Sequence, residues 1–148
     1  MNFGVDPLLI EAVIQQESGG KADAFRFEPG FYLRYLEKDP KFKGQDPRRI
    51  SSSYGLMQLM YTTALELGFQ GEPEELFDVG LNINLGTKLL AKLLKKFDGD
   101  VEKTLAAYNG GTGGISKVQP LAYAKTVMMR YDFLKTTRPA GHNLQRNA

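Results

Sequence analysis

One glutamate occupies a position where a carboxylic acid could act as a catalyst. Glu17 falls on the apolar face of an expected helix, one turn after Val13 and Ile14. Burial disfavours the ionised form of a carboxyl group, and the negative end of a helix dipole acts in the same direction. We therefore expect a raised pKa for Glu17. A carboxyl group that stays neutral near pH 7 can protonate a glycosidic oxygen. The alternative is a half-exposed glutamate whose carboxylate reaches water.

A second candidate is the apolar run of residues 55–60, which contains a single amide, Gln58. Its carboxamide can both donate to and accept from a sugar hydroxyl or acetamide group. Gly55, which opens the run, would let the backbone approach a ligand closely. The same residues also fit a buried connector with a bend at Gly55, and the run alone does not separate the two interpretations.

Two tyrosines complete the set of groups with usable chemistry. Tyr108 and Asn109 lie at the end of an expected helix, where they either line the rim of a pocket or belong to a simple helix stop. In the second case Asn109 or Gly110 would adopt the left-handed conformation. Tyr123 falls on the apolar face of the last expected helix, where packing in the core is the usual role of a tyrosine.

Composition excludes several other kinds of chemistry. The chain has 148 residues, which fits one domain with one core. It has no cysteine and a single histidine, His142, in a polar tail, so a Ser-His-Asp triad and a multi-histidine metal site are improbable. We expect no metal and no organic cofactor. Acid/base chemistry must then come from carboxylates or tyrosines.

Charge and hydropathy limit the partners. The net charge of +2 is too small, and the basic residues too scattered, to indicate nucleic acid. No apolar run reaches the ~20 residues of a membrane span. The N-terminus lacks the pattern of a signal peptide. We therefore expect a chain that is exported by other means, has lost its signal, or is an excised domain.

These groups must be positioned by helices. A helix capped by Asp6 and Pro7 should end at Gly19-Gly20. Later periodic segments predict helices near 62–67, 82–97, 101–108 and 120–134. Residues 38–49 are charged and punctuated by Gly and Pro, so we expect a loop there, after a short helix near 31–37. The fold class is mainly α, with room for two or three short strands in 25–53.

The candidate residues, taken in order, resemble the motifs of the soluble lytic transglycosylase family, the relatives of goose-type lysozyme. The resemblance rests on Glu17-Ser18, Gly55-Leu56-Met57-Gln58, Ala107-Tyr108-Asn109 and Tyr123. It covers residues 3–134, and the segments Gly4–Pro7 and Ala12–Gln15 also resemble the first helix of that family.

The resemblance implies a lysozyme-like single domain with a groove for peptidoglycan glycan strands. It implies that Glu17 is the only acid/base, cleaving the bond between N-acetylmuramic acid (MurNAc) and N-acetylglucosamine (GlcNAc) with formation of a 1,6-anhydro ring. It further implies the roles of seven other residues: Gln58, Met60 and Tyr108 line the groove, Asn109 supports its rim, Tyr123 points its hydroxyl toward Glu17, Ser18 fixes the turn after the acid, and Tyr54, by its residue type, packs on a sugar face.

The sequence departs from the family pattern at three places. Tyr61 replaces a common proline, and Gly110-Gly111 follows Asn109 where the family commonly has Ala-Gly. The stretch between Glu17 and Gly55 is longer than in many members. It holds acids that could supply the second carboxylate of a muramidase, a hydrolase of the same bond; they are Glu28, Glu37, Asp39 and Asp46.

Three functions therefore remain open: a lytic transglycosylase, a goose-type-like muramidase, and an inactive glycan-binding domain. For the first we expect a catalytic domain in residues 1–134 and a polar tail in 135–148, acting as a monomer at the cell wall or periplasm. The protein is expected to be encoded either by a bacterium or by a phage.

Overall fold

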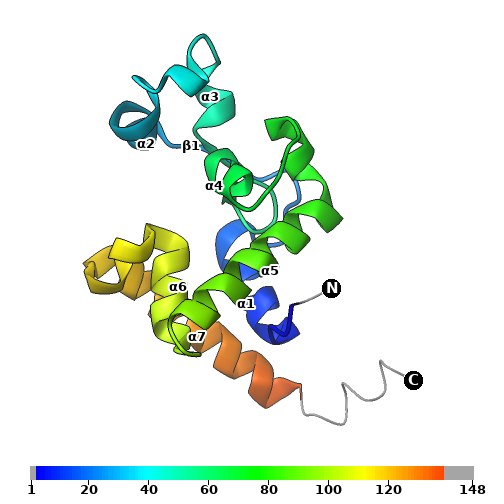
Figure 1. The fold of residues 1–148 in the computed structure, drawn as a ribbon. Coiled ribbons are helices and arrows are strands. Elements are labelled where there is room, and N and C mark those ends of the chain that lie inside the picture. The colour runs from blue at the N-terminus through cyan, green and yellow to red at the C-terminus, as the bar shows by residue number, and fades with distance from the viewer. Residues whose placement is uncertain (1–2, 139–148) are drawn as a thin grey trace. The chain divides into compact units, whose positions relative to one another are not determined.

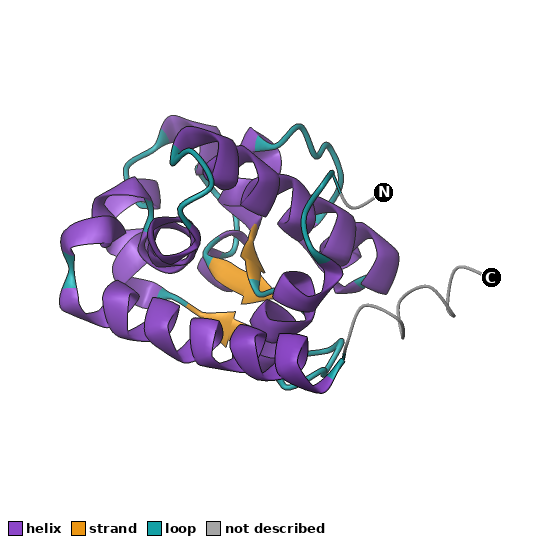
Figure 2. Ribbon diagram, turned by 90° about the horizontal axis from the view of Figure 1, so that it is seen from below, coloured by secondary structure: helices purple, strands orange, loops and turns teal. Residues whose placement is uncertain are grey.

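The computed structural model describes residues 3–138 and is mainly helical, with one small antiparallel sheet, as predicted (Figures 1 and 2). The α-helices are α1 (Pro7–Ser18), α2 (Pro29–Phe31), α3 (Pro47–Ile50), α4 (Tyr61–Glu66), α5 (Val79–Lys96), α6 (Val101–Gly110) and α7 (Val118–Thr137). The strands are β1 (Phe25–Phe27), β2 (Ser52–Tyr54) and β3 (Leu59–Met60). A π-helix, η1 (Tyr32–Leu36), and three 3₁₀-helices complete the list: η2 (Pro40–Phe42), η3 (Pro73–Phe77) and η4 (Thr112–Ser116).

The chain divides into two units, which we describe separately. Among the described residues, the first unit is Glu17–Lys88, and the second consists of residues 3–16 and 89–138. Two helices contain the points of division. In α1 the division falls after Gln16, and in α5 it falls after Lys88.

Helix α1 has the ends that its sequence predicts. The Asp6 carboxylate accepts the backbone N–H of Leu8 at 2.9 Å, so it supplies a partner to a donor that the first helical turn leaves unpaired. At the other end, Gly19 and Gly20 have φ values of 63° and 85°, which a residue with a side chain rarely adopts. The helix therefore stops directly after Ser18.

The sheet belongs to the first unit and has the strand order β1-β2-β3. Both strand pairings are antiparallel, with Phe25 opposite Tyr54 and Tyr54 opposite Leu59. Strand β2 is buried although it is Ser-Ser-Tyr. Burial of Ser52 is accommodated because its hydroxyl finds a backbone partner, the carbonyl of Arg48.

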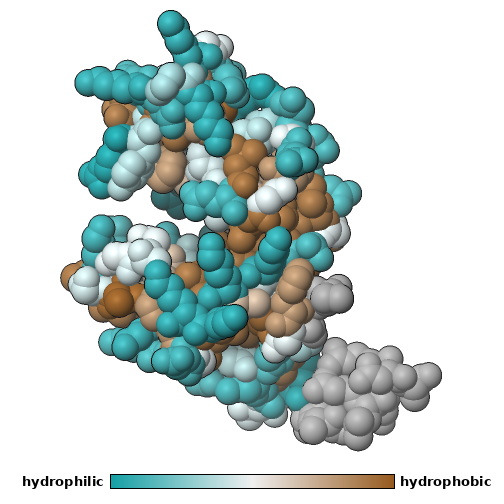
Figure 3. Space-filling view, viewed as in Figure 1, coloured by the Kyte–Doolittle hydropathy of each residue, from teal (hydrophilic) through white to brown (hydrophobic). Residues whose placement is uncertain are grey.

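Residues 28–50 of the first unit contribute a small core, against which Tyr61 and Leu65 of α4 also pack. Leu36, Phe42 and Ile50 are buried together. The π-helix η1 arises because the backbone N–H of Glu37 bonds to the carbonyl of Tyr32, five residues earlier. Hydrophilic side chains dominate the region of α2 and α3 in Figure 3. The predicted loop over 38–49 is thus interrupted by one turn of 3₁₀-helix and by α3.

The second unit is built on the pairing of α6 with α7. The Asp100 side chain accepts the backbone N–H of Lys103 at 3.0 Å, which confirms the predicted cap of α6. Small residues allow a close approach where the chain turns toward α7. A Cβ atom at Gly114 would lie 2.6 Å from the carbonyl oxygen of Ala106. A Cβ atom at Gly110 would likewise lie 2.5 Å from the Pro120 ring, so close packing requires glycine at these two positions.

In the second unit, the Tyr131 hydroxyl donates to the second Asp6 carboxylate oxygen at 2.8 Å. Burial and this hydrogen bond raise the pKa of Tyr131 to about 12. The folded state therefore holds the phenolic proton more tightly than the unfolded chain, whose tyrosine pKa is near 10. The resulting stability is complete below about pH 10 and is lost as the pH rises through about 12.

We therefore expect Tyr131→Phe to unfold in less urea than the wild type at neutral pH, because it lacks the bond to Asp6. We also expect its stability to fall less steeply between about pH 10 and pH 12. Urea unfolding curves at several alkaline pH values measure both. Identical pH dependence in the two proteins would contradict this role of Tyr131.

Most helices are longer than the periodic pattern indicates. Helix α5 begins at Val79 rather than near 82, and α7 runs from Val118 to Thr137 rather than from 120 to 134. The first residues of the predicted polar tail are therefore helical, and residues 139–148, including His142, lie outside the described residues. None of the helices described is both long and apolar enough to cross a membrane.

Candidate functional site

Glu17 is the second-to-last residue of α1 and is half-buried. Val13, one turn earlier on the same helix, is fully buried. The Ser18 hydroxyl oxygen accepts the backbone N–H of Gly20 at 3.2 Å, so Ser18 braces the turn that follows the acid, as predicted. The end of α1 and its glycine turn thus fix the backbone on which Glu17 is carried.

Gln58 ends the four-residue turn between β2 and β3. Its backbone has a φ of 50°, which is uncommon for a residue with a side chain. Its Nε2 group donates to the carbonyls of Ala24, at 3.1 Å, and Gly55, at 3.0 Å. The amide donor is thereby used within the protein, and the Oε1 atom is the part of the carboxamide suited to accept from a ligand.

Sequence reasoning missed Asn82, a fully buried residue of α5 that holds this turn. The signal that could have revealed it is an amide at a position that the predicted helix shares with Leu85 and Leu89. An amide on such a face requires hydrogen-bond partners inside the protein. In the structure these partners are backbone groups of β2, of the turn and of η3; they are the carbonyls of Tyr54 and Leu76 and the N–H of Met57, each at 2.8 Å.

Tyr54 corrects one expectation. Its side chain is 1% exposed, and its ring packs edge-on against Phe25 and Phe77, at centroid distances of 5.3 and 5.1 Å. The hydroxyl donates to the carbonyl of Arg49 at 2.6 Å, and burial raises the pKa of Tyr54 to about 12. The prediction that Tyr54 packs on a sugar face is therefore wrong, because its ring is buried in the first unit's core and its hydroxyl is bonded there.

Met60 is half-buried and pairs with Ser53 at the end of β3. It directly precedes Tyr61, the first residue of α4, where proline is favoured. Tyr61 compensates for that departure by donating its hydroxyl to the carbonyl of Gly71 at 3.1 Å. Tyr61 therefore links the start of α4 to the loop that follows the helix, and Met60 is the residue directly before α4.

The remaining predicted residues belong to the second unit. Tyr108 and Asn109 lie in the last turn of α6, where Tyr108 is half-buried and Asn109 is exposed. The residue with positive φ at this end is Gly111, at 74°, and not Asn109 or Gly110, so the predicted site of the helix stop is corrected by one or two residues. Tyr123 is half-buried on α7.

The structure thus groups the predicted residues by unit. Glu17, Ser18, Gln58 and Met60 belong to the first unit, together with the buried Tyr54. Tyr108, Asn109 and Tyr123 belong to the second. Within the first unit, the end of α1 carries the acid. The β2–β3 turn and the short strand that leads into α4 carry the groove candidates.

Three of the four acids considered for a second carboxylate have structural partners. Asp39 accepts the backbone N–H of Lys41 and caps η2, and Asp46 accepts that of Arg48 and caps α3, each at 2.9 Å. Glu28 forms an ion pair with Arg26 at 3.0 Å. Glu37, the fourth acid, is exposed at the end of η1. Three of these four carboxylates therefore serve the local fold.

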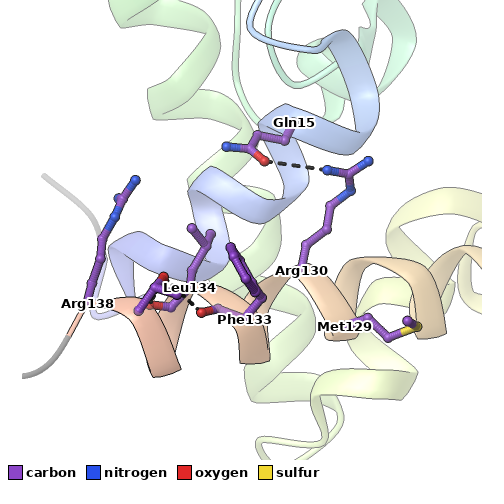
Figure 4. A pocket seen from close by; sticks show the side chains of 7 residues that line it. Gln15, Met129, Arg130, Phe133, Leu134 and Arg138 are labelled. Atoms are coloured by element: carbon purple, nitrogen blue, oxygen red, sulfur yellow. Dashed lines mark hydrogen bonds between the residues drawn. The ribbon is translucent and has the colours of Figure 1, made fainter.

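The residues described contain no cluster of three or more His, Asp or Glu side chains arranged to bind a metal ion. A surface pocket of about 470 Å³ lies in the second unit, between α1 and α7 (Figure 4). None of the predicted site residues lines it. In it the Arg130 guanidinium donates to Gln15 at 3.5 Å and to Gln16 at 3.1 Å, so its charged group is held by α1.

Comparisons of the sequence with known proteins identify a family that it matches. Residues 1–127 match the model of the transglycosylase SLT domain. The chain is 38% identical over 96 residues to peptidoglycan transglycosylase gp16 of Escherichia phage T7, covering 63% of this chain and 7% of that protein. It is 32% identical over 130 residues to membrane-bound lytic murein transglycosylase C of Edwardsiella ictaluri, covering 78% and 30%, and 33% identical over 112 residues to the transglycosylase of Enterobacteria phage PRD1, covering 74% and 31%. The chain therefore spans less than a third of the length of these relatives.

Two solved structures share the fold. An inactive mutant of the lytic transglycosylase Slt from Pseudomonas aeruginosa matches 92% of this chain and 22% of its own, with a TM-score of 0.69 and 22% identity. The 70 kDa soluble lytic transglycosylase from Escherichia coli matches 90% and 22%, with a TM-score of 0.66 and 21% identity. At these identities the likeness concerns the fold alone, whereas the family model matches most of the sequence. On that match, this chain belongs to the transglycosylase SLT domain family.

Proposed function

We propose that this chain is the catalytic domain of a peptidoglycan lytic transglycosylase and cleaves the β-1,4 bond between MurNAc and GlcNAc. The observation that carries the proposal is the match of residues 1–127 to the transglycosylase SLT domain. The named relatives, a lytic murein transglycosylase and two phage transglycosylases, support a cell-wall substrate and site of action.

In the proposed reaction Glu17 acts first as an acid and then as a base. Its carboxyl proton passes to the oxygen of the leaving GlcNAc as the C1–O bond of MurNAc breaks, and the MurNAc acetamide oxygen bonds to C1. The Glu17 carboxylate then removes the proton of the C6 hydroxyl, whose oxygen displaces the acetamide at C1. The product is a 1,6-anhydro ring, Glu17 is neutral again, and no water is consumed. This resembles the substrate-assisted exceptions to the two-carboxylate rule.

The other predicted residues serve this step by holding the glycan. Gln58 and Met60 contact the sugars from the first unit, with the Gln58 Oε1 atom as the hydrogen-bond acceptor. The same family resemblance extends the proposal to Tyr108 and Asn109 at the end of α6 and to Tyr123 on α7, all residues of the second unit. In this proposal the catalytic domain is residues 1–134, and the polar residues 135–148 lie outside it.

A muramidase would need a second carboxylate to hold a water molecule, about 6.5–9.5 Å from the first in an inverting enzyme. Asp39 and Asp46 cap helices, and Glu28 pairs with Arg26. The oxygens of these three carboxylates already accept from the backbone or an arginine, so they are less available to hold a water molecule. These contacts support the transglycosylase over the hydrolase.

The products decide between the two reactions. We expect the chain to release muropeptides from purified peptidoglycan that are lighter, by the mass of one water, than the hydrolysed disaccharides. Mass spectrometry of the soluble fraction measures this difference. Reducing-end products would make the chain a muramidase, and release of nothing from several wall types would favour a glycan-binding domain without turnover.

A further inference from the structure

Asn82 takes no part in the proposed reaction, yet its side chain is buried and fully hydrogen-bonded. It is 0% exposed and its carboxamide makes three hydrogen bonds of 2.8 Å. The Nδ2 group donates to the carbonyls of Tyr54 and Leu76, and the Oδ1 atom accepts the N–H of Met57. These bonds satisfy every hydrogen of the amide group and three backbone groups around the β2–β3 turn. A buried network with each of these partners satisfied specifies one arrangement of the turn.

Helix α5 holds the same turn at a second point, one turn beyond Asn82. Met57 is fully buried, and its side chain lies directly over Gly86, where a Cβ atom would be 2.4 Å from the Met57 sulfur. The backbone N–H of Met57 and its side chain are therefore both fixed by α5, by Asn82 and by the absence of a side chain at Gly86. The turn cannot shift along the helix without losing one of the two contacts.

The position of the turn determines the position of the Gln58 carboxamide. One of the two acceptors of Gln58 Nε2 is the carbonyl of Gly55, which belongs to the turn itself. The other, the carbonyl of Ala24, also accepts the N–H of Gly55 at 2.8 Å. Movement of the Gly55–Met57 backbone would therefore displace both partners that orient Gln58.

We propose that Asn82 is a positioning residue for glycan binding: it fixes the Gly55–Gln58 turn on α5 and, through the turn, the Gln58 carboxamide that contacts the sugar. The inference rests on the proposed function for the identity of the ligand. Asn82 itself is buried and does not touch the glycan, so its effect must act through Gln58.

The informative substitution is Asn82→Asp, which keeps the size of the side chain and its acceptor for Met57. A carboxyl group has at most one proton to offer, where the amide has two, so at least one of the carbonyls of Tyr54 and Leu76 loses its donor. With soluble glycan strands as substrate, we expect KM to rise about tenfold while kcat changes little, because a displaced binding group weakens substrate binding more than the step at Glu17. Asn84→Asp is the matched control: it makes the same change on the exposed side of α5 and should leave KM unchanged.

A double-mutant cycle tests whether Asn82 acts through Gln58. We expect Gln58→Ala to raise KM by a similar factor, and Asn82→Asp to add little to it, because both remove the same contact. Additive increases would overturn the proposal. A lower urea midpoint for Asn82→Asp with an unchanged KM would also overturn it, since Asn82 would then serve stability alone. If Asn82→Asp does not fold, Asn82→Ser replaces it in the same cycle.

Amide hydrogen exchange keeps this inference separate from the proposed function. We expect the amides of 55–58 to exchange faster in Asn82→Asp than in the wild type and in Asn84→Asp. Unchanged exchange would contradict the positioning of the turn, whatever the activity. A wild-type chain that exchanges as expected but cleaves no peptidoglycan would contradict the proposed function and leave the role of Asn82 in the turn supported.

Discussion

We expect the Glu17→Gln protein to fold as the wild type does and to lose nearly all release of muropeptides from peptidoglycan. Glutamine has the size of glutamic acid and can still form hydrogen bonds, but it cannot give a proton to the leaving oxygen or take one from the C6 hydroxyl. General acid/base catalysis supplies ~10²–10⁴-fold in rate, and here one group performs both transfers, so the loss should reach at least the upper part of that range. Initial rates on purified peptidoglycan, with circular dichroism of each protein, measure the two expectations.

Two variants make this result interpretable. Glu66→Gln makes the same chemical change at an exposed residue at the end of α4 and should keep wild-type turnover. Tyr123→Phe should reduce the rate less than Glu17→Gln, because a hydroxyl that only assists the reaction contributes less than the acid that performs both proton transfers. Near wild-type turnover of Glu17→Gln would contradict the assignment of Glu17 as the catalytic acid. A larger loss in Tyr123→Phe than in Glu17→Gln would mean that the acid is another residue.

The sequence predicts α1 and the position of Glu17 well because both depend on local signals. Asp6 and Pro7 start the helix, and Gly19-Gly20 ends it, each through contacts within a few residues. The cap of α6 at Asp100 is local in the same way. Helical periodicity is also a local property, and this is why the α-helices after residue 60 are predicted with errors confined to their ends, whereas the short 3₁₀-helices η3 and η4 are missed.

The β2–β3 hairpin shows where such reasoning stops. Strand β3 has two residues, too few for an alternating pattern, and it lies beyond the 25–53 range in which strands were expected. The turn is held by Asn82 of α5, which is distant in the sequence. Its lone amide could have raised the question of a buried partner, but not which backbone groups it would bind.

Tyr54 illustrates the same limit for side chains. A tyrosine beside a glycine-containing run has the right chemistry to stack on a sugar. Its actual surroundings, the rings of Phe25 and Phe77, come from a neighbouring strand and from η3. Residue type therefore predicted a group capable of binding sugar, whereas the tertiary contacts decide whether its ring faces a ligand or the core.

Gly55 carries the largest expected effect on stability. Its φ of 75° is unfavourable for a residue with a Cβ atom, and such an atom would lie 2.6 Å from Asn82 Nδ2 and 2.9 Å from the carbonyl oxygen of Leu76. Neither neighbour can move easily, since the two are bonded to each other at 2.8 Å. We expect Gly55→Ala to lower the free energy of unfolding by about 3 kcal/mol, combining the cost of a left-handed alanine with that of overpacking.

Gly44→Ala separates the two contributions. Gly44 has a φ of 80°, close to that of Gly55, but a Cβ atom there would meet nothing within 4 Å. It should therefore lose only about 1 kcal/mol, the cost of the backbone conformation alone. Urea unfolding of both variants measures the difference. Equal losses would show that the turn relaxes away from Asn82 at little cost, which would also weaken the case that α5 fixes the Gln58 carboxamide. A larger loss at Gly55, with an increase in KM beyond that of Gly44→Ala, would tie the close packing of the turn to glycan binding.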